Sequence, residues 1–392
     1  MAAATQSAPV PAHELINEAN QPPMLRSNYG DYLDQSSVGW LKETLTTASL
    51  GEMRQRFDQD GYLFIKGLIP RDDVLDVRQK YFEHLAPTGI LRPGTVARDG
   101  IFDTSQDPIV HNGVGGSDLP EDIERQRLLE SAHTMPIYLA FLEHPDFRAF
   151  VRSFMGWQKD IILKRTLLRH NVPNGLSTGC HYDRIFLRAG EDFLTASVPI
   201  GDCTAEGGGL MYMEDSTDIG KAMEADFMKR AEHFTPEERI SGFNHNMARD
   251  GQLSHNAVEL DADINMRYGS TGGTKRRWLA GNYEAGDVVF HNPYMIHGAY
   301  GILCNIQFSG MVITNSGKKM LMERIPGEAD GPMSDIAKRT YAGSFDNCAE
   351  FCDEYDDPSA PCMDVAYHDG YCKSYGTITG TFSLAGGIAA VR

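Results

Sequence analysis

Apolar and polar residues alternate near the N-terminus in a way that predicts a helix, a strand and a second helix. The first helix is expected after Ser49, since apolar residues follow at intervals of three and four: Leu50, Met53 and Phe57. The turn Asp60-Gly61 and the apolar run at 62–65 then predict a strand. A second helix is expected after Pro70, because two acidic residues stand in its first turn and one face is apolar: Val74, Val77 and Tyr81.

Short β-like runs dominate the middle of the chain. Turns separate four of them between residues 161 and 213: IILKRTLLRH, HYDRIFLRAG, FLTASVPIGD and GGGLMYME. The pattern resumes at residues 276–300, and residues 217–274 are interpreted as an insertion that begins with an amphipathic helix. Several short strands at close spacing favour a sandwich or barrel.

Composition and charge narrow the function classes. The formal net charge is −18 and the pI is about 5.1, so phosphate backbones and anionic membranes are repelled. No apolar run reaches the roughly 18 residues that a membrane-spanning helix needs, and the N-terminus has no signal-peptide pattern. We therefore expect a cytoplasmic protein that binds neither nucleic acid nor membrane.

The same patterns divide the chain into segments. We expect a flexible leader at 1–39, a large domain at 40–315 that contains the insertion, a polar linker at 316–340 and a small C-terminal segment at 341–392. That last segment holds four of the seven cysteines: Cys348, Cys352, Cys362 and Cys372.

His181-Tyr182-Asp183 is the sharpest chemical feature. In an extended strand, His181 and Asp183 point to the same face and can bind one metal ion from adjacent positions. A further histidine, His297, follows the β-run at 287–290. Two histidines and one carboxylate leave three metal positions open, as in non-haem Fe(II) oxygenases, whereas a structural zinc site is closed. A 2-oxo acid takes two such positions and O2 takes the third.

Four stretches together resemble the phytanoyl-CoA dioxygenase family, specifically its fungal-type small-molecule members. The similarity runs from about Trp40 to Ala299, and these stretches carry it: DGYLFIKGLIPRDDV, HYDRIFLRAG, FLTASVPIGDCTAEGGGLMYMEDS and YEAGDVVFHNPYMIHGA. The resemblance implies a mainly β fold with flanking helices, the double-stranded β-helix of the jelly-roll type, joined here to a small cysteine-containing C-terminal segment.

The resemblance also implies the chemistry. Fe(II), 2-oxoglutarate and O2 are the expected cofactor and co-substrates, with His181, Asp183 and His297 as iron ligands and catalytic residues. Because a halogenating relative would carry Gly or Ala in place of Asp183, hydroxylation or a related oxidation is expected. The expected substrate is a small hydrophobic metabolite or an acyl derivative.

The sequence departs from the family at the co-substrate. The family carries an Arg ten or eleven residues beyond the distal histidine, which clamps the far carboxylate of 2-oxoglutarate. Gln307 and Phe308 stand there instead, and an uncharged partner for a buried anion costs on the order of 3–5 kcal/mol. Gln307, Arg165 and Arg169 are our candidates for binding the co-substrate, and Lys164, Arg276 and Arg277 are further cations that could replace the missing one.

The C-terminal segment resembles part of a PAN/apple-like module. In that module, the resemblance would pair Cys348 with Cys372 and Cys352 with Cys362, while the sequence alone leaves three connectivities open. Zinc binding by the same four cysteines is the alternative. The module implies contact with a protein or a carbohydrate.

Three alternatives remain open. His291, which follows the same β-run, could replace His297 as the distal ligand. The chain could be a catalytically silent jelly-roll relative that binds a metal or a small molecule but lost its co-substrate anchor. It could also act as an interaction protein through its C-terminal segment.

Overall fold

A computed structural model provides the fold. Apart from Pro22 and a few isolated residues near 240–256, it describes residues 24–27, 31–111, 122–163, 166–175, 177–184, 193–205, 207–235, 256–268, 275–300 and 306–315, and four strands between 338 and 391. From Tyr300 onward, it describes the backbone of the strands.

The larger sheet has seven strands in the order β2-β3-β9-β6-β11-β4, with β5 also paired to β11. These strands are β2 (Glu43–Leu45), β3 (Tyr62–Lys66), β4 (Asp160–Ile162), β5 (Leu167–Asn171), β6 (Phe193–Pro199), β9 (Val288–His291) and β11 (Ile306–Asn315). All its pairs are antiparallel except β2 with β3.

The smaller sheet has the order β1-β8-β7-β10. Its strands are β1 (Val38–Trp40), β7 (Gly209–Met213), β8 (Trp278–Ala280) and β10 (His297–Tyr300). From β5 to β11 the chain passes repeatedly from one sheet to the other, because β6, β9 and β11 belong to the larger sheet and β7, β8 and β10 to the smaller. This winding is the jelly roll of a double-stranded β-helix and confirms the expected fold class.

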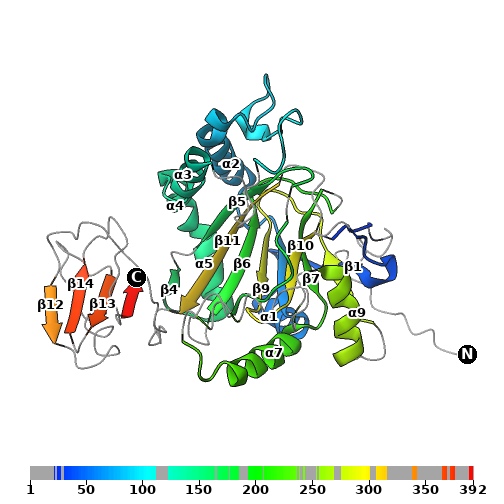
Figure 1. Cartoon of the computed structure of the whole chain (residues 1–392), viewed down its shortest axis with the longest axis vertical. Helices are drawn as coiled ribbons and strands as arrows, with labels where there is room; N and C mark the ends of the chain where they lie inside the picture. Colours follow the sequence, from blue (N-terminus) through cyan, green and yellow to red (C-terminus); the bar gives the residue numbers. More distant parts are fainter. Residues whose placement is uncertain are drawn as a thin grey trace, which may run out of the picture.

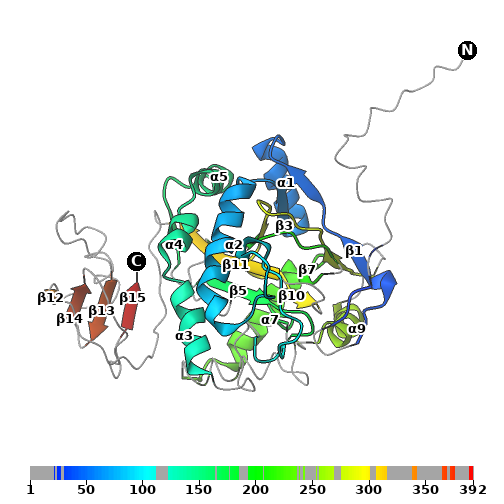
Figure 2. The ribbon, with the colours of Figure 1, turned by 90° about the horizontal axis from the view of Figure 1, so that it is seen from above.

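Helices cover the larger sheet on one side (Figures 1 and 2). They are α1 (Leu50–Asp60), α2 (Arg71–Leu85), α3 (Ile123–Ala132), α4 (Pro136–Leu142) and α5 (Pro145–Met155). Their apolar faces pack on β6 and β9 in one buried cluster; in α5, for example, the Phe147 ring stacks on Phe290 at 5.8 Å.

Local sequence explains where α1 begins and ends. The Ser49 hydroxyl accepts a hydrogen bond from the amide of Glu52, which caps the helix, and Gly61 ends it with a φ of +75°. A Cβ on Gly61 would lie 2.5 Å from the Thr217 hydroxyl oxygen, so the turn needs glycine for two reasons.

The segment at 217–274 contains two helices, α7 (Thr217–Arg230) and α9 (Ala257–Tyr268). The first agrees with the amphipathic pattern in the sequence. Both pack on the smaller sheet in a second buried cluster, to which Leu25, Leu33 and Val38 also contribute. Part of the predicted leader therefore lies against the core, where β1 pairs in parallel with β8.

The stretch HYDRIFLRAG does not behave as a regular strand where the structure describes it. His181 makes an isolated bridge to His297, and residues 182–184 leave the extended conformation. The prediction of a strand here is wrong for residues 182–184, because the chain bends at Asp183 to bring its carboxylate back toward His181.

The C-terminal strands form a sheet of their own in the order β12-β14-β13-β15. They are β12 (Lys338–Tyr341), β13 (Asp364–His368), β14 (Tyr371–Tyr375) and β15 (Ile388–Val391). Cys372 lies on β14, while Cys348, Cys352 and Cys362 lie outside the described residues. The segment boundaries, the PAN/apple resemblance and the disulfides stay predictions.

None of the helices in the described part of the chain is long and apolar enough to cross a membrane.

Candidate metal centre

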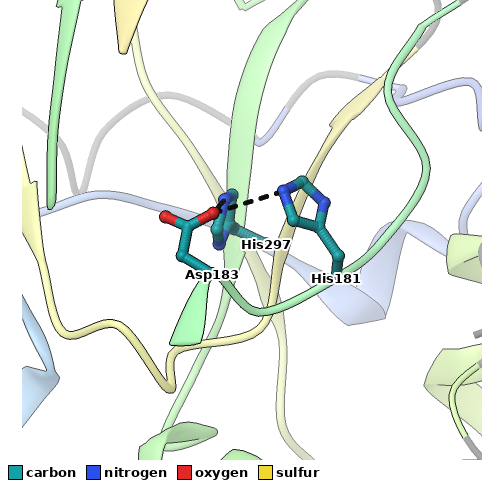
Figure 3. A group of neighbouring side chains, drawn as sticks. All are labelled: His181, Asp183 and His297. Carbon is teal, nitrogen blue, oxygen red and sulfur yellow. Dashed lines mark ion pairs between the residues drawn. The ribbon is translucent and has the colours of Figure 1, made fainter. Parts of the chain in front are cut away.

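The backbone brings the two predicted histidine ligands together. The amides of His181 and His297 each donate to the other residue's carbonyl oxygen at 2.8 Å, which joins the chain before Asp183 to β10. The imidazole centroids lie 4.4 Å apart. Figure 3 shows the two rings and the Asp183 carboxylate pointing toward one another.

Each imidazole is oriented by the carbonyl group two residues before it. The Nδ1 of His181 lies 2.8 Å from the Gly179 oxygen, and the Nδ1 of His297 lies 2.9 Å from the Met295 oxygen. A carbonyl oxygen only accepts, so Nδ1 carries the proton in each ring. In each ring, Nε2 therefore presents a lone pair, as metal ligation requires.

The two carboxylate oxygens of Asp183 contact different partners. Its Oδ1 lies 3.5 Å from the Nε2 of His181 and 3.7 Å from the Nε2 of His297. Ligand atoms about 2.1 Å from a common ion lie roughly 3–3.5 Å apart, so these separations suit one ion. Within the described residues, His181, Asp183 and His297 form a group whose ligand atoms all lie within 4.8 Å of one another.

Electrostatics favour the protonation states of a metal site. Burial alone would raise the pKa of Asp183, but its interactions with His297, His181 and His291 hold that pKa well below its usual value. Burial lowers the pKa of His297 to about 3, although the Asp183 charge acts in the opposite direction. At neutral pH the carboxylate is ionised and His297 is neutral, which are the ligating forms.

His291 does not lie at the distal-ligand position that the alternative assigned to it. Its Nε2 lies 3.0 Å from Asp183 Oδ2, so it donates to the carboxylate oxygen that faces away from His181. It is not a member of the group of three. The structure brings His297, rather than His291, to the remaining corner.

Tyr212 on β7 lies beside His291 on β9 and His297 on β10. Its ring stacks on His297 at 5.7 Å and lies 5.2 Å from His291. Burial and then the Asp183 charge raise the pKa of its phenol, so the group remains protonated. The sequence offered no signal for this residue, because an aromatic side chain on a strand is typical of packing.

The co-substrate candidates have different positions. Arg165 lies outside the described residues. The β11 backbone pairs Gln307 with His170 and Phe308 with Arg169 on β5. Arg169 is partly buried and its Nη1 donates to the Thr178 hydroxyl at 3.0 Å.

Several buried polar atoms of the described residues have no hydrogen-bond partner. Three belong to residues near the site in sequence or register: Asn171 Oδ1, Ser177 Oγ and Thr195 Oγ1. Such atoms are costly to leave unpaired, and they fit a site that takes a polar ligand. Two imidazole nitrogens and one carboxylate oxygen therefore fit a divalent iron, and the Ser177 and Thr195 hydroxyls can donate to the oxygens of a 2-oxo acid.

A family comparison decides the assignment. Residues 57–303, more than half of the chain, match the phytanoyl-CoA dioxygenase (PhyH) family. The chain belongs to this family. It is a non-haem Fe(II)/2-oxoglutarate-dependent oxygenase that uses O2 and acts on a small molecule.

Similar solved structures are distant. The non-heme alpha ketoglutarate dependent carbocyclase SnoK from nogalamycin biosynthesis is 17% identical, with 69% of this chain and 85% of that chain covered and a TM-score of 0.43. EctD from S. alaskensis with bound Fe is 15% identical over 76% and 85%, with a TM-score of 0.41. HygX from Streptomyces hygroscopicus with nickel and 2-oxoglutarate bound is 13% identical over 69% and 88%, with a TM-score of 0.38. No curated protein matches the sequence.

Proposed function

We propose that this PhyH-family oxygenase hydroxylates or otherwise oxidises a C–H bond of a small hydrophobic metabolite or an acyl derivative, with iron held by His181, Asp183 and His297. The convergence of one carboxylate oxygen and two Nε2 atoms is the observation that carries the proposal. Membership of the family supports the substrate class.

The chain's own residues would hold the iron in a defined way. His181 and His297 would bind it through Nε2, because each Nδ1 proton is held by a carbonyl oxygen. Asp183 would bind through Oδ1, while His291 keeps Oδ2 engaged. With 2-oxoglutarate bound, the iron would supply O2 activation, with succinate and CO2 as co-products.

The side chains around the three iron ligands would keep water and charged groups away from the metal. His297 is 4% exposed and His291 is 1% exposed, so the ligand side chains are shielded on the β10 and β9 sides. Tyr212, kept protonated by its burial, closes the site beside both rings. A carboxylate ligand at 183 occupies a position that a halide would otherwise take, which supports oxidation rather than halogenation.

Removal of His181 tests the ligand set. The variant His181→Ala is expected to lose stoichiometric Fe(II) binding, measured anaerobically by equilibrium dialysis with metal analysis, because two remaining ligands bind a divalent ion weakly. His144→Ala is the matched control, since His144 contacts Asp73 outside the group of three. Retained stoichiometric iron in His181→Ala would disprove the ligand assignment.

The weak visible band of an Fe(II)/2-oxoglutarate chelate tests the co-substrate. Anaerobic addition of both to the full chain is expected to produce the band. If none forms at millimolar 2-oxoglutarate, the silent-relative alternative replaces this proposal. If the band does form, succinate release with a panel of acyl thioesters and neutral hydrophobic compounds identifies the substrate class. The cytoplasmic location and a contact through the C-terminal segment stay predictions.

A further inference from the structure

Arg169 lies on the interior face of the jelly roll, and no carboxylate of the described residues forms an ion pair with it. The strand expected to carry the co-substrate's arginine, β11, contains no arginine. We propose that Arg169 on β5 binds the distal carboxylate of 2-oxoglutarate, from the strand adjacent to β11. This inference rests on the proposed function and names the anchoring residue of the same site.

Strand register places Arg169 on the face that holds the metal centre. Across the larger sheet, Arg169 is opposite Phe308, and Phe308 is opposite Pro199. Four residues earlier on β6, Thr195 is opposite His291, whose ring contacts Asp183. Because residues at even spacing and directly paired residues share a face, Arg169 lies on the same face as His291.

The same register places position 307 on the other face. Gln307 is opposite His170, and the His170 ring contacts the Tyr81 hydroxyl of α2 at 2.7 Å. That face is covered by the helices. A neutral residue at a helix-covered position is a poor replacement for the missing arginine, whereas Arg169 is charged and lies on the metal side.

The charge of Arg169 is incompletely compensated. Thr178 accepts its one hydrogen bond in the described part of the chain, and no described carboxylate forms an ion pair with it. Burial lowers the pKa of Arg169, while the charge of Asp183 acts in the opposite direction. A guanidinium has five donors in a planar fork that matches a carboxylate, so a bound anion would satisfy it.

Other described cations near the site already have partners. Arg277 binds Glu214 through two nitrogens at 2.8 and 3.1 Å. Arg78 donates to three backbone carbonyl oxygens, and Arg184 lies over the Phe193 ring. On β6, the Thr195 hydroxyl lies in the same row as His291, four residues from the Arg169 row. It has no hydrogen-bond partner among the described residues and is a further donor for an anionic ligand.

Two 2-oxo acids distinguish binding of the distal carboxylate from binding of the end that chelates iron. 2-Oxoglutarate and 2-oxobutanoate share the group that binds iron, but the second has no distal carboxylate. Each is titrated anaerobically into the full chain with Fe(II), and the visible chelate band gives its affinity. Loss of one partner of a desolvated charge pair lowers affinity about 30-fold or more.

Arg169→Gln is therefore expected to bind 2-oxoglutarate at least about 30-fold more weakly while its affinity for 2-oxobutanoate changes less than about 3-fold. Arg277→Gln and Gln307→Ala are the matched controls and are expected to leave both affinities unchanged. If Arg169→Gln does not fold, Arg169→Lys decides, with an expected loss of about 10-fold because an ammonium cannot form the fork.

The outcomes separate this inference from the proposed function. A wild-type chain that forms no chelate with either acid contradicts the proposed function itself. A normal wild-type chelate, with 2-oxoglutarate affinity unchanged in Arg169→Gln or Arg169→Lys, overturns only the role of Arg169. The role of Arg169 is also overturned if Arg169→Gln loses the same affinity for both acids. It is overturned as well if the 30-fold loss of 2-oxoglutarate affinity occurs in Gln307→Ala or Arg165→Gln instead.

Discussion

His291 is the residue whose role depends most on a single contact. Its Nε2 donates to Asp183 Oδ2 at 3.0 Å, and its own Nδ1 has no partner among the described residues. A carboxylate held at one oxygen presents the other in a fixed direction. We infer that His291 orients Asp183 rather than binding the metal.

Substitution of His291 tests this role. His291→Ala is expected to weaken Fe(II) binding by about 10–100-fold without abolishing it, because the ligands remain but one loses its orientation. His291→Gln, whose amide can donate to the same oxygen, is expected to recover part of that affinity. Competition with a chelator of known affinity measures both. A loss as complete as in His181→Ala would show that His291 is itself a ligand.

Much of the candidate site could be predicted from the sequence, and its limits have physical causes. The HxD spacing and the following distal histidine predict a metal centre, since both are local patterns. His291 and His297 follow the same β-run, so the choice between them depends on the bridge between residues 181 and 297. A contact across more than a hundred residues leaves no local signal.

A buried polar chain joins α2 to β5. The Tyr81 hydroxyl lies 2.7 Å from His170 Nδ1, and His170 Nε2 lies 2.7 Å from the His111 carbonyl oxygen. The carbonyl fixes the proton on Nε2, so Nδ1 accepts from Tyr81. Burial lowers the pKa of His170 to about 4, and the neutral ring is the form that joins the helix to the sheet.

This contact predicts a loss of stability in acid. Below pH 6.5, the pKa of His170 in the unfolded chain, this imidazole is protonated in the unfolded chain but stays neutral in the folded chain. The free energy of unfolding therefore falls as pH falls toward 4. Between neutral pH and about pH 4.5, His170 contributes roughly 2–3 kcal/mol of this loss. Urea unfolding at both pH values measures it.

His170→Gln is the matched variant, because its amide can donate to His111 and accept from Tyr81 without titrating. Its unfolding free energy is expected to change less over the same pH interval, by roughly the contribution assigned to His170. An equal pH dependence in the variant and the wild type would contradict the assignment. His111, whose pKa burial also lowers, is unchanged in both chains.

Elements with a local pattern were predicted well and those defined by distant contacts were not. The helices at 50–60 and 71–85 and the strand between them follow from spacing, caps and a glycine turn. The helices at 123–155 were not predicted, although α5 buries residues at helical spacing: Phe147, Val151 and Phe154. The alternation at residues 182–184 predicts a strand, but the chain bends at Asp183 and ends the pairing after His181.

At the scale of the whole molecule, the segment before residue 41 completes the smaller sheet. β1 pairs with β8, β8 with β7, and β7 with the β10 strand that carries His297. Three side chains of the segment are nearly inaccessible, at 1–4%: Leu25, Leu33 and Val38. Lys275 and the Ser37 hydroxyl both bind the Asp261 carboxylate of α9, which fixes the segment to the insertion. Figure 1 shows β1 and α9 close together on this side.

Two truncations separate the contribution of this segment from that of the residues before it. Deletion of residues 1–40 removes β1 and its buried side chains and is expected to cost on the order of 5 kcal/mol, which corresponds to a fall in Tm of about 10 °C. Deletion of residues 1–21 leaves every described contact in place and is expected to leave Tm unchanged. Calorimetry of both chains measures this, and Fe(II) binding to the longer deletion is expected to weaken because β10 lies in the damaged sheet. Equal melting temperatures would show that β1 adds nothing to the sheet that holds His297.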